Sequence, residues 1–354
     1  MRKNFLITTG GSGGHVLPAQ IIFEHLSKVK NVIISIDKRG LKYLEKDVYQ
    51  FEIVDTPKLN NVFFFPINLI KILILTLKSF FLLKRKKIEK VFSTGGYMSL
   101  PVILAARLLK LDIYLLEPNQ VLGRANRYFL RSCKKIFCYS KNIKKFPNES
   151  KYKIITINPL VKKNIYDLNE SIKIKDKFIL LIVGGSQGAS IFDGGLKKSI
   201  VSISKKNPIK IIQQTAEKNI SSLTNFYSKN HIENKIFSYE KDFFKYVQEA
   251  DLCITRAGAS TLAELSVMNT PFVAVPLPTS KDDHQMENAK FYKESNSCWI
   301  IDQSNFEEKI EEFLANILNN KSDYLNKKEN LKKLNYQNTW INVNQKILKI
   351  INEN

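Results

Sequence analysis

The chain has 354 residues, of which 44% are hydrophobic and 25% charged, a composition that fits a folded globular protein and excludes disorder of the whole chain. Its length fits two domains, each large enough to bury its own core. Lysine and arginine number 55 against 33 acidic residues, which gives a net charge of +22. Nucleic acid is not expected as a partner, because only eight of these basic residues are arginine, the residue that proteins prefer for phosphate and base contacts.

The cysteines and the first residues exclude two further classes of protein. None of Cys133, Cys138, Cys253 and Cys298 forms a C-x-x-C pair or lies at zinc-binding spacing from a histidine. We therefore expect no metal and reduced, buried thiols, as in a cytoplasmic protein. The apolar run before Gly10 is too short for the core of a signal peptide, and we expect it to form the first strand.

Short apolar runs alternate with amphipathic stretches of helical length along the chain. This alternation predicts an α/β fold with parallel sheets that are covered by helices on both faces. In chain order, the predicted strands are Asn4–Thr9, Asn31–Ile36, Lys90–Ser93, Asp112–Leu115, Lys135–Tyr139, Phe178–Val183, Ile209–Gln213, Lys235–Ser238, Asp251–Thr255 and Pro271–Val275. The predicted helices include Leu17–Val29, Ser99–Leu109 and Ser260–Met268.

Two of these strands end in similar glycine-rich turns, Gly10–Gly14 and Gly184–Gly188, which lie 184 − 10 = 174 residues apart. The repetition predicts two doubly wound domains, with the boundary in the polar stretch after Pro159. The expected domains are residues 1–160 and 161–337. A helical tail, residues 338–354, is expected to pack back on the first domain.

Each glycine-rich turn is expected to contact a ligand, because glycine lets the backbone approach closely and the next helix offers free N–H groups to a diphosphate. Neither turn is a P-loop, and Val16 stands where a dinucleotide fingerprint has its third glycine. The alternative is a tight turn without a ligand. Two such turns at equivalent places favour the ligand.

Polar residues after other strands are further candidates for a site. His15 closes the first turn and can act as a general base, or it can simply bond a neighbouring carbonyl. Glu117 and Asn119 face a ligand or form a turn with Pro118. His25 and His231 have no such context, and we expect both at the surface.

The second half of the chain offers a similar set. Ser260 and Thr261 can cap a helix and bind phosphate oxygens. Glu264 lies one turn further on, where a carboxylate can bind the hydroxyls of a ribose or serve only as an acid near the helix start. The loop Pro276–Gln285 lines the crevice or is merely solvated.

The stretch Val62–Leu83 is the most apolar part of the chain. Pro66 and the basic residues within it argue against a transmembrane helix. Lys71, Lys78 and Arg85 recur every seven residues and share one stripe, which is typical of a helix lying in a membrane interface. A buried core helix is the alternative, just as a lysine-rich bias is the alternative explanation of the net charge.

Taken in order, these motifs resemble the MurG family of peptidoglycan glycosyltransferases, glycosyltransferase family 28. The motifs are Gly10–His15, Ser93–Tyr97, Glu117–Asn119, Gly184–Ala189, Arg256–Thr261 with Glu264, Asp283–Gln285 and Asn288–Ala289. Each motif is weak alone, but the ordered set is specific and covers the chain from Asn4 to about Ala289.

The resemblance implies a GT-B fold, in which two Rossmann-like domains face each other across a cleft. It implies an inverting transfer of N-acetylglucosamine from UDP-N-acetylglucosamine to the C4 hydroxyl of N-acetylmuramic acid in lipid I, giving lipid II, without metal or cofactor. Lipid I is undecaprenyl-diphosphoryl-N-acetylmuramoyl-pentapeptide. The enzyme would work peripherally on the anionic, cytoplasmic face of the bacterial inner membrane, with its N-terminal domain on the lipid acceptor.

The resemblance also implies roles for single residues, with His15 as the general base and Glu117 as the second candidate. Substrate contacts are implied for Ser12, Gly13, Gly14, Asn119, Lys162, Ser186, Arg256, Ala259, Ser260, Thr261, Leu262, Glu264 and Gln285. Of these, Ser12 to Gly14 and Ser186 would contact the donor diphosphate or sugar, Asn119 and Gln285 the N-acetylglucosamine, and Arg256 to Glu264 the uridine.

Some positions depart from the family pattern. Where the family commonly has Asn-Pro-Val-Arg, this sequence reads Asn158-Pro159-Leu160-Val161-Lys162, so the arginine contact is lost or moved to Lys162. Asp193 replaces a common asparagine, and Pro118 a common glutamine. Three alternatives share the fold or the ligand: a UDP-sugar transferase acting on diacylglycerol, a UDP-N-acetylglucosamine 2-epimerase, and a non-catalytic UDP-sugar-binding subunit. An epimerase would not need the apolar, basic helix.

Overall fold

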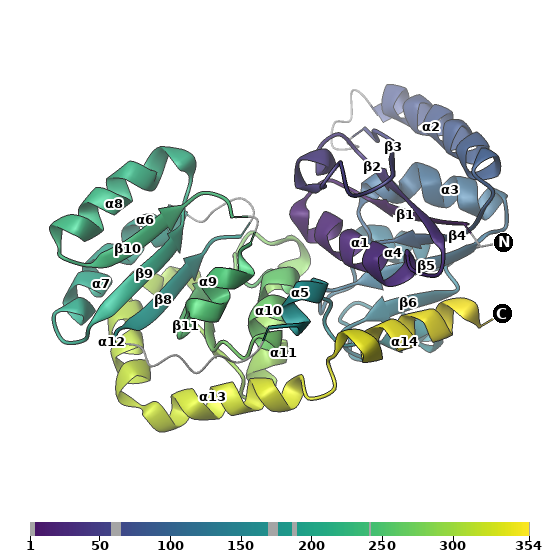
Figure 1. Ribbon diagram of the computed structural model, residues 1–354. Coiled ribbons are helices and arrows are strands. Elements are labelled where there is room, and N and C mark those ends of the chain that lie inside the picture. The colour runs from purple at the N-terminus through teal and green to yellow at the C-terminus, as the bar shows by residue number, and fades with distance from the viewer. Residues whose placement is uncertain (1–3, 58–64, 169–175, 186–189, 241, 354) are drawn as a thin grey trace. The chain divides into compact units, whose positions relative to one another are not determined.

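The computed structural model describes residues 4–57, 65–168, 176–185, 190–240 and 242–353 (Figure 1). The chain forms two compact units. The first comprises Met1–Lys163 together with Thr339–Asn354, and the second comprises Asn164–Asn338. The C-terminal helix therefore belongs to the same unit as the N-terminus.

The first unit is built on a seven-stranded sheet with the order β3-β2-β1-β4-β5-β6-β7, in which the strands pair in parallel. The strands are β1 (Asn4–Thr9), β2 (Asn31–Ile36), β3 (Phe51–Ile53), β4 (Ile88–Ser93), β5 (Asp112–Glu117), β6 (Lys135–Cys138) and β7 (Ile154–Thr156). Its helices are α1 (Gly13–Leu26), α2 (Phe65–Arg85), α3 (Leu100–Leu108), α4 (Arg124–Phe129) and α14 (Trp340–Asn352). The short α5 (Lys163–Tyr166) follows β7.

The second unit repeats the plan with a six-stranded parallel sheet of order β10-β9-β8-β11-β12-β13. Its strands are β8 (Phe178–Val183), β9 (Ile209–Gln214), β10 (Glu233–Phe237), β11 (Leu252–Thr255), β12 (Phe272–Ala274) and β13 (Trp299–Ile300). Its helices are α6 (Ser190–Gly195), α7 (Lys197–Ser204), α8 (Ile220–Lys229), α9 (Phe244–Glu249), α10 (Ala259–Val267), α11 (His284–Glu294), α12 (Phe306–Asn319) and α13 (Lys321–Leu334).

Both sheets are buried on both faces, which explains their continuous apolar runs. In β1, Phe5 and Ile7 pack in one core with α1 and α14, while Leu6 packs in the other with α2 and α3. In β8, Leu180 and Leu181 divide in the same way between two cores. Because successive side chains of a strand point to opposite faces, each strand joins two helical layers. The prediction of parallel sheets covered on both faces is confirmed.

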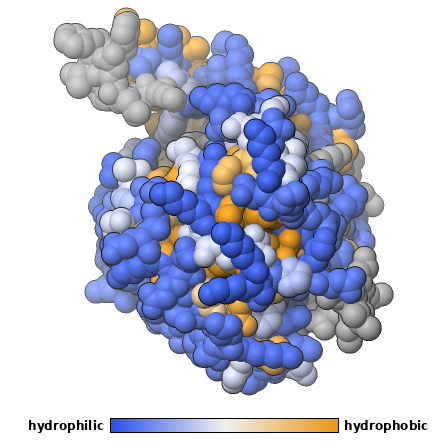
Figure 2. Space-filling view, turned by 90° about the vertical axis from the view of Figure 1, so that its left-hand side faces the viewer, coloured by the Kyte–Doolittle hydropathy of each residue, from blue (hydrophilic) through white to orange (hydrophobic). Residues whose placement is uncertain are grey.

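The surface is largely hydrophilic where Figure 2 shows it, with hydrophobic residues confined to patches between the polar ones. All four cysteines are free and buried. Burial raises the pKa of the Cys133 thiol to about 11, so it stays protonated at neutral pH. The expectation of buried thiols is confirmed.

One expectation about the surface is wrong. His231 is exposed as predicted, but His25 is only 1% exposed. Its ring stacks on Trp340 of α14, with ring centroids 3.7 Å apart, and Asn344 Nδ2 donates to the His25 carbonyl oxygen at 3.0 Å. The sequence hid this because the partners lie more than 300 residues further along the chain.

Candidate functional site

The strand order of the first unit reverses beside β1, because β2 lies on one side of this strand and β4 on the other. Ligands of open α/β sheets bind outside the carboxyl ends of the strands at such a point. There β1 runs into the turn Gly10–His15, and β4 runs into the loop that contains Thr94. The structure therefore brings two predicted motifs together.

The first turn needs its glycines. Gly10 and Gly11 have φ of +147° and +76°, conformations that other residues rarely adopt. Ser12 then takes an extended conformation as the residue before α1, which begins at Gly13. The N–H groups of Gly13 and Gly14 thus lie in the first turn of a helix, where they have no carbonyl of the preceding turn to bond and can meet an anion.

His15 is held by one hydrogen bond across the switch point. Its Nδ1 lies 2.8 Å from the carbonyl oxygen of Thr94. A carbonyl only accepts, so Nδ1 carries a proton, and a neutral His15 presents the lone pair of Nε2. The bond to a neighbouring carbonyl, one of the two interpretations of the sequence, is present and orients the ring. The role of His15 as a general base stays a prediction.

Glu117, the second candidate base, is buried at the end of β5 and surrounded by donors. Its two oxygens accept from the backbone N–H of Asn119 and Gly123, at 3.2 and 2.8 Å, and from the side-chain amides of Asn119 and Asn126, both at 3.0 Å. These bonds favour a structural role for the carboxylate, which fixes Asn119 and the start of α4. A carboxylate in this setting has little room for a substrate hydroxyl.

Lys162 lies elsewhere in the first unit. Its Nζ is 3.8 Å from Glu45 Oε1, and both side chains are about one-third exposed. Such a pair contributes little to stability, since solvent screens it. The structure thus leaves the proposed replacement of the family's arginine by Lys162 as a prediction.

The second unit has its own switch point between β8 and β11. The strand β8 ends in the turn that begins Gly184-Gly185, and Gly185 has φ of +78°. Ser186 lies outside the described residues. The strand β11 leads through Gly258 into α10. The same architecture thus recurs where the sequence repeats.

The start of α10 corrects one expectation. Gly258 precedes the first helical residue, Ala259, so Ser260 and Thr261 lie inside the first turn and do not cap the helix. Their N–H groups and hydroxyls lie at the positive end of the helix dipole. Glu264 follows on the half-buried side. Leu262 is fully buried in the core, and its N–H donates to the Gly258 carbonyl, which favours packing over contact with a nucleotide.

Arg256 and Gln285 tie the loops of this site together. Arg256 donates to the carbonyl of Val275 at 3.1 Å and to Gln303 Oε1 at 2.6 Å. Burial lowers the pKa of the Arg256 guanidinium, but it remains charged at neutral pH. Gln285 Oε1 accepts the N–H groups of Ala257 and Leu277, so a ligand would meet its Nε2.

Sequence reasoning missed one buried carboxylate, Asp37, and noted a half-buried one, Asp193, only as a departure from the family pattern. Asp37 follows β2 and accepts the N–H of Gly11 at 2.7 Å. Asp193 in α6 accepts from Gln213, Thr215 and Asn219 at 2.8 to 3.2 Å. For Asp37, the signal available was a charged residue directly after a strand whose last five residues are buried. Within the described residues, no group of three or more His, Cys, Asp or Glu side chains is placed to hold a metal ion.

The helix α2 turns an apolar face outward. The segment Val62–Phe64 before it lies outside the described residues. The apolar face of α2 consists of large hydrophobic side chains that are 47% to 67% exposed: Ile67, Leu69, Ile70, Leu73, Ile74, Leu77 and Phe81. Its other face packs against α3 (Figure 1), with Ile72 and Leu83 buried. The alternative of a buried core helix is wrong.

Cations line one edge of this apolar face. Lys71, Lys78 and Arg85 are exposed, and their spacing keeps them on one stripe. A cavity of 340 Å³ beside the helix is lined in part by Lys71, Ile74 and Lys78. The segment Pro66–Arg85 is long and apolar enough to cross a membrane by length and composition, and 22% of it is buried within the unit.

Two family models match the chain. The glycosyltransferase family 28 N-terminal domain matches residues 5–138, and the glycosyltransferase family 28 C-terminal domain matches residues 179–339. The chain is 48% identical, over the full length of both proteins, to the UDP-N-acetylglucosamine–N-acetylmuramyl-(pentapeptide) pyrophosphoryl-undecaprenol N-acetylglucosamine transferase of Pelagibacter ubique.

Solved structures show the same likeness. The chain is similar to MurG of Acinetobacter baumannii, with a TM-score of 0.76 and 26% identity over 99% of each chain. It is also similar to UDP-GlcNAc 2-epimerase from Neisseria meningitidis, with a TM-score of 0.67 over 99% of this chain and 100% of that one. At 12% identity, the second likeness concerns the fold alone.

Proposed function

The chain belongs to glycosyltransferase family 28, in the MurG branch, and from this premise we propose that it transfers N-acetylglucosamine from UDP-N-acetylglucosamine to lipid I, giving lipid II. The two parallel-sheet units are those of a GT-B glycosyltransferase. The observation that carries the proposal is the pair of equivalent switch-point sites in a chain that matches such a transferase at 48% identity from end to end.

The second unit would hold the donor. The first turn of α10 offers N–H groups and the hydroxyls of Ser260 and Thr261 to the diphosphate. Glu264 is suited to the ribose hydroxyls, and Gln285 Nε2 to the donor sugar. When UDP leaves, negative charge grows on its phosphate, and the positive end of the α10 dipole stabilises that charge.

The first unit would hold the acceptor and the base. The C4 hydroxyl of N-acetylmuramic acid attacks the anomeric carbon of the donor, and the bond from that carbon to the UDP oxygen breaks. His15 Nε2 takes the hydroxyl proton, while its Nδ1–H stays bonded to the Thr94 carbonyl. A single displacement of this kind inverts the anomeric centre. Glu117 then has the supporting task of holding Asn119.

The alternatives are less well supported. A 2-epimerase shares the fold at 12% identity, whereas both family 28 domain models and the full-length relative point to transfer. Transfer to diacylglycerol would use the same donor site, and only the acceptor separates it. A non-catalytic binding subunit would have no need of His15, which the Thr94 carbonyl holds in a base-competent tautomer.

We further propose that α2 attaches the first unit to the anionic, cytoplasmic surface of the membrane. Its exposed apolar face can enter the headgroup region, while the cations along its edge meet lipid phosphates. Each cation near an anionic surface contributes about 1 kcal/mol. Because the other face of α2 packs on α3, the helix can lie in the interface without leaving its unit.

The test of transfer is an acceptor panel. The purified chain is incubated with UDP-N-acetylglucosamine and, separately, a short-chain lipid I analogue, diacylglycerol, or no acceptor, and the products are separated and weighed by mass spectrometry. We expect one added N-acetylhexosamine on the lipid I analogue alone. Glycosylated diacylglycerol as the product would show that the proposed acceptor is wrong. A second UDP-sugar formed without an acceptor would show that the proposed reaction is wrong.

A further inference from the structure

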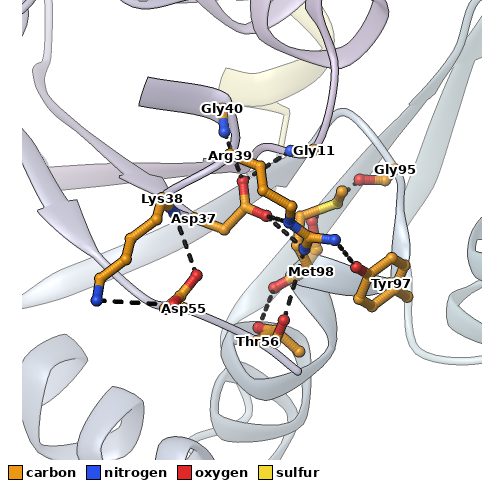
Figure 3. A network of polar contacts seen from close by, with 11 residues as sticks. Gly11, Asp37, Lys38, Arg39, Gly40, Asp55, Thr56, Gly95, Tyr97 and Met98 are labelled. Atoms are coloured by element: carbon orange, nitrogen blue, oxygen red, sulfur yellow. Dashed lines mark hydrogen bonds and ion pairs between the residues drawn. The ribbon is translucent and has the colours of Figure 1, made fainter. Parts of the chain in front are cut away.

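A buried carboxylate lies at the edge of the proposed acceptor site without belonging to any motif discussed so far. Asp37 follows β2 and is 0% exposed. It accepts the backbone N–H of Gly11 at 2.7 Å and of Gly40 at 3.0 Å, and the Nε–H of Arg39 at 2.7 Å (Figure 3). One carboxylate thus holds the glycine-rich turn, the short helix that begins at Gly40, and an arginine.

Arg39 carries the connection to two further loops. Its Nη1 donates to the Tyr97 hydroxyl, and its guanidinium lies over the Tyr97 ring, 5.0 Å from the centroid. Thr56, in the loop after β3, donates from Oγ1 to the Met98 carbonyl at 2.9 Å. Figure 3 shows these side chains converging from the loops that follow β2, β3 and β4.

The glycine-rich turn is wedged into this network. A Cβ atom on Gly10 would lie 2.3 Å from Asp37 Oδ1, and one on Gly11 would lie 2.3 Å from Met98 Cε. On the other side, a Cβ atom on Gly96 would lie 2.1 Å from Met98 Sδ and 3.5 Å from Nε2 of His15. Asp37 and Met98 therefore fix the turn from two sides, next to the nitrogen proposed as the base.

We propose that Asp37, acting through Arg39 and Tyr97, is a positioning residue that sets where His15 and the first-turn N–H groups of α1 meet the acceptor. The inference rests on the proposed function. Asp37 itself is buried away from any substrate, so its influence passes through the Gly11 N–H and the loop that carries Tyr97. The ion pair with Arg39 keeps the buried charge compensated.

The test is Asp37→Asn, which keeps the shape of the side chain and removes its charge. Initial rates are measured with UDP-N-acetylglucosamine and the soluble lipid I analogue, and UDP binding is measured by calorimetry. We expect kcat to fall roughly 10- to 100-fold and the acceptor KM to rise, because a small misplacement of reacting groups costs that much. The UDP Kd should stay within about twofold, since Ser260, Thr261 and Glu264, which are proposed to hold UDP, lie in the other unit.

The matched control is Asp47→Asn, the same change at an exposed position of the same β2–β3 connection, which should leave all constants unchanged. Should Asp37→Asn not fold, Tyr97→Phe removes only the hydroxyl that Arg39 bonds and should raise the acceptor KM in the same direction. If Asp37→Asn lowers turnover and the fraction of protein that binds UDP by the same factor, with both KM values unchanged, the variant has only lost folded protein. That result would overturn the inference, because Asp37 would then serve stability alone. If the wild type transfers nothing to any acceptor, the proposed function fails instead.

Discussion

His15 is the residue on which the proposed chemistry depends, and a single hydrogen bond decides which of its nitrogens can act. Since the Thr94 carbonyl accepts from Nδ1, proton uptake is left to Nε2. The buried Glu117 has four donors around its oxygens, which suits a group that holds Asn119 and the start of α4 in place. The two candidates named from the sequence thus have different geometries.

The variant His15→Asn keeps the hydrogen bond that orients the side chain and removes the nitrogen proposed as the base. The amide can still donate to the Thr94 carbonyl, but it cannot take a proton, so turnover should fall by roughly 10² to 10⁴. UDP affinity should barely change. His231→Asn, at an exposed histidine of the other unit, serves as the control in the same rate assay. If His15→Asn stays active while Glu117→Gln is inactive, the base is Glu117.

Glu264 is the residue whose removal tests the donor site. Glu264→Ala should weaken UDP binding by about 1.5 to 3 kcal/mol, because a hydrogen bond to a charged group is lost. Titration calorimetry with UDP measures this directly. Glu294→Ala removes an exposed glutamate at the end of α11 and should leave the affinity unchanged. An unaltered affinity in Glu264→Ala would take that carboxylate out of the site.

At the scale of single elements, the strands show what sequence patterns can and cannot predict. The predicted bounds of central strands such as β1 and β8 match the structure, because most of their residues are buried and each contains an apolar run. The edge strands β3, β7 and β13 were missed, since each has only two or three residues. Periodicity identifies a strand only when it is long enough to repeat.

The site was predictable to the extent that its residues lie in local motifs. The turn before His15 can be recognised in the sequence, because its glycines directly follow a predicted strand. Asp37 gave only the signal of a charge after a strand, and His25 gave none, because their roles arise from partners elsewhere in the chain: Gly11 and Arg39 for Asp37, Trp340 for His25. Such roles belong to tertiary packing, which neither spacing nor composition encodes.

The α1–α14 contact predicts a pH dependence of stability. Burial lowers the pKa of His25 from 6.5 to about 3. Between these two pH values, the unfolded chain binds a proton at His25 and the folded chain does not. Stability from this group is therefore present above pH 6.5 and is lost as the pH falls toward 3. Between pH 7 and 5 the loss is about 2 kcal/mol.

His25→Phe keeps a ring to stack on Trp340 but cannot be protonated. The free energy of unfolding, measured with denaturant at pH 7 and pH 5, should therefore fall less in this variant than in the wild type, by about 2 kcal/mol. His231→Asn should follow the wild type. Equal pH slopes for wild type and His25→Phe would mean that His25 does not remain neutral in the folded unit.

The helix α2 carries the prediction about the membrane. Replacing Lys71, Lys78, Lys84 and Arg85 with glutamine should reduce flotation with anionic vesicles and make the remainder less sensitive to salt, since screening acts within about 10 Å at 0.1 M salt. Activity on a soluble acceptor should persist. The control removes the same number of exposed charges from α13, at Lys321, Lys328, Lys332 and Lys333. Equal flotation of both variants would move the membrane face elsewhere.

At the scale of the whole molecule, the chain uses one architectural rule twice. Each unit opens with a strand, a glycine-rich turn and a switch point between the first strand and its reversed neighbour. In the first unit this geometry holds His15, the proposed base, and in the second it presents the start of α10 with hydroxyls and a carboxylate. The proposed base and the proposed anion site lie on separate units, and they are the two components that transfer of a sugar from UDP requires.

The measurement that tests this account most directly is nuclear magnetic resonance of one reaction mixture containing the wild-type chain, UDP-N-acetylglucosamine and the soluble lipid I analogue. The account predicts a single new disaccharide, with N-acetylglucosamine β-linked to C4 of the muramic acid, and UDP formed in equal amount. An α-linked product, attachment at another hydroxyl, or a UDP-sugar epimer formed at the same rate with and without acceptor would contradict it.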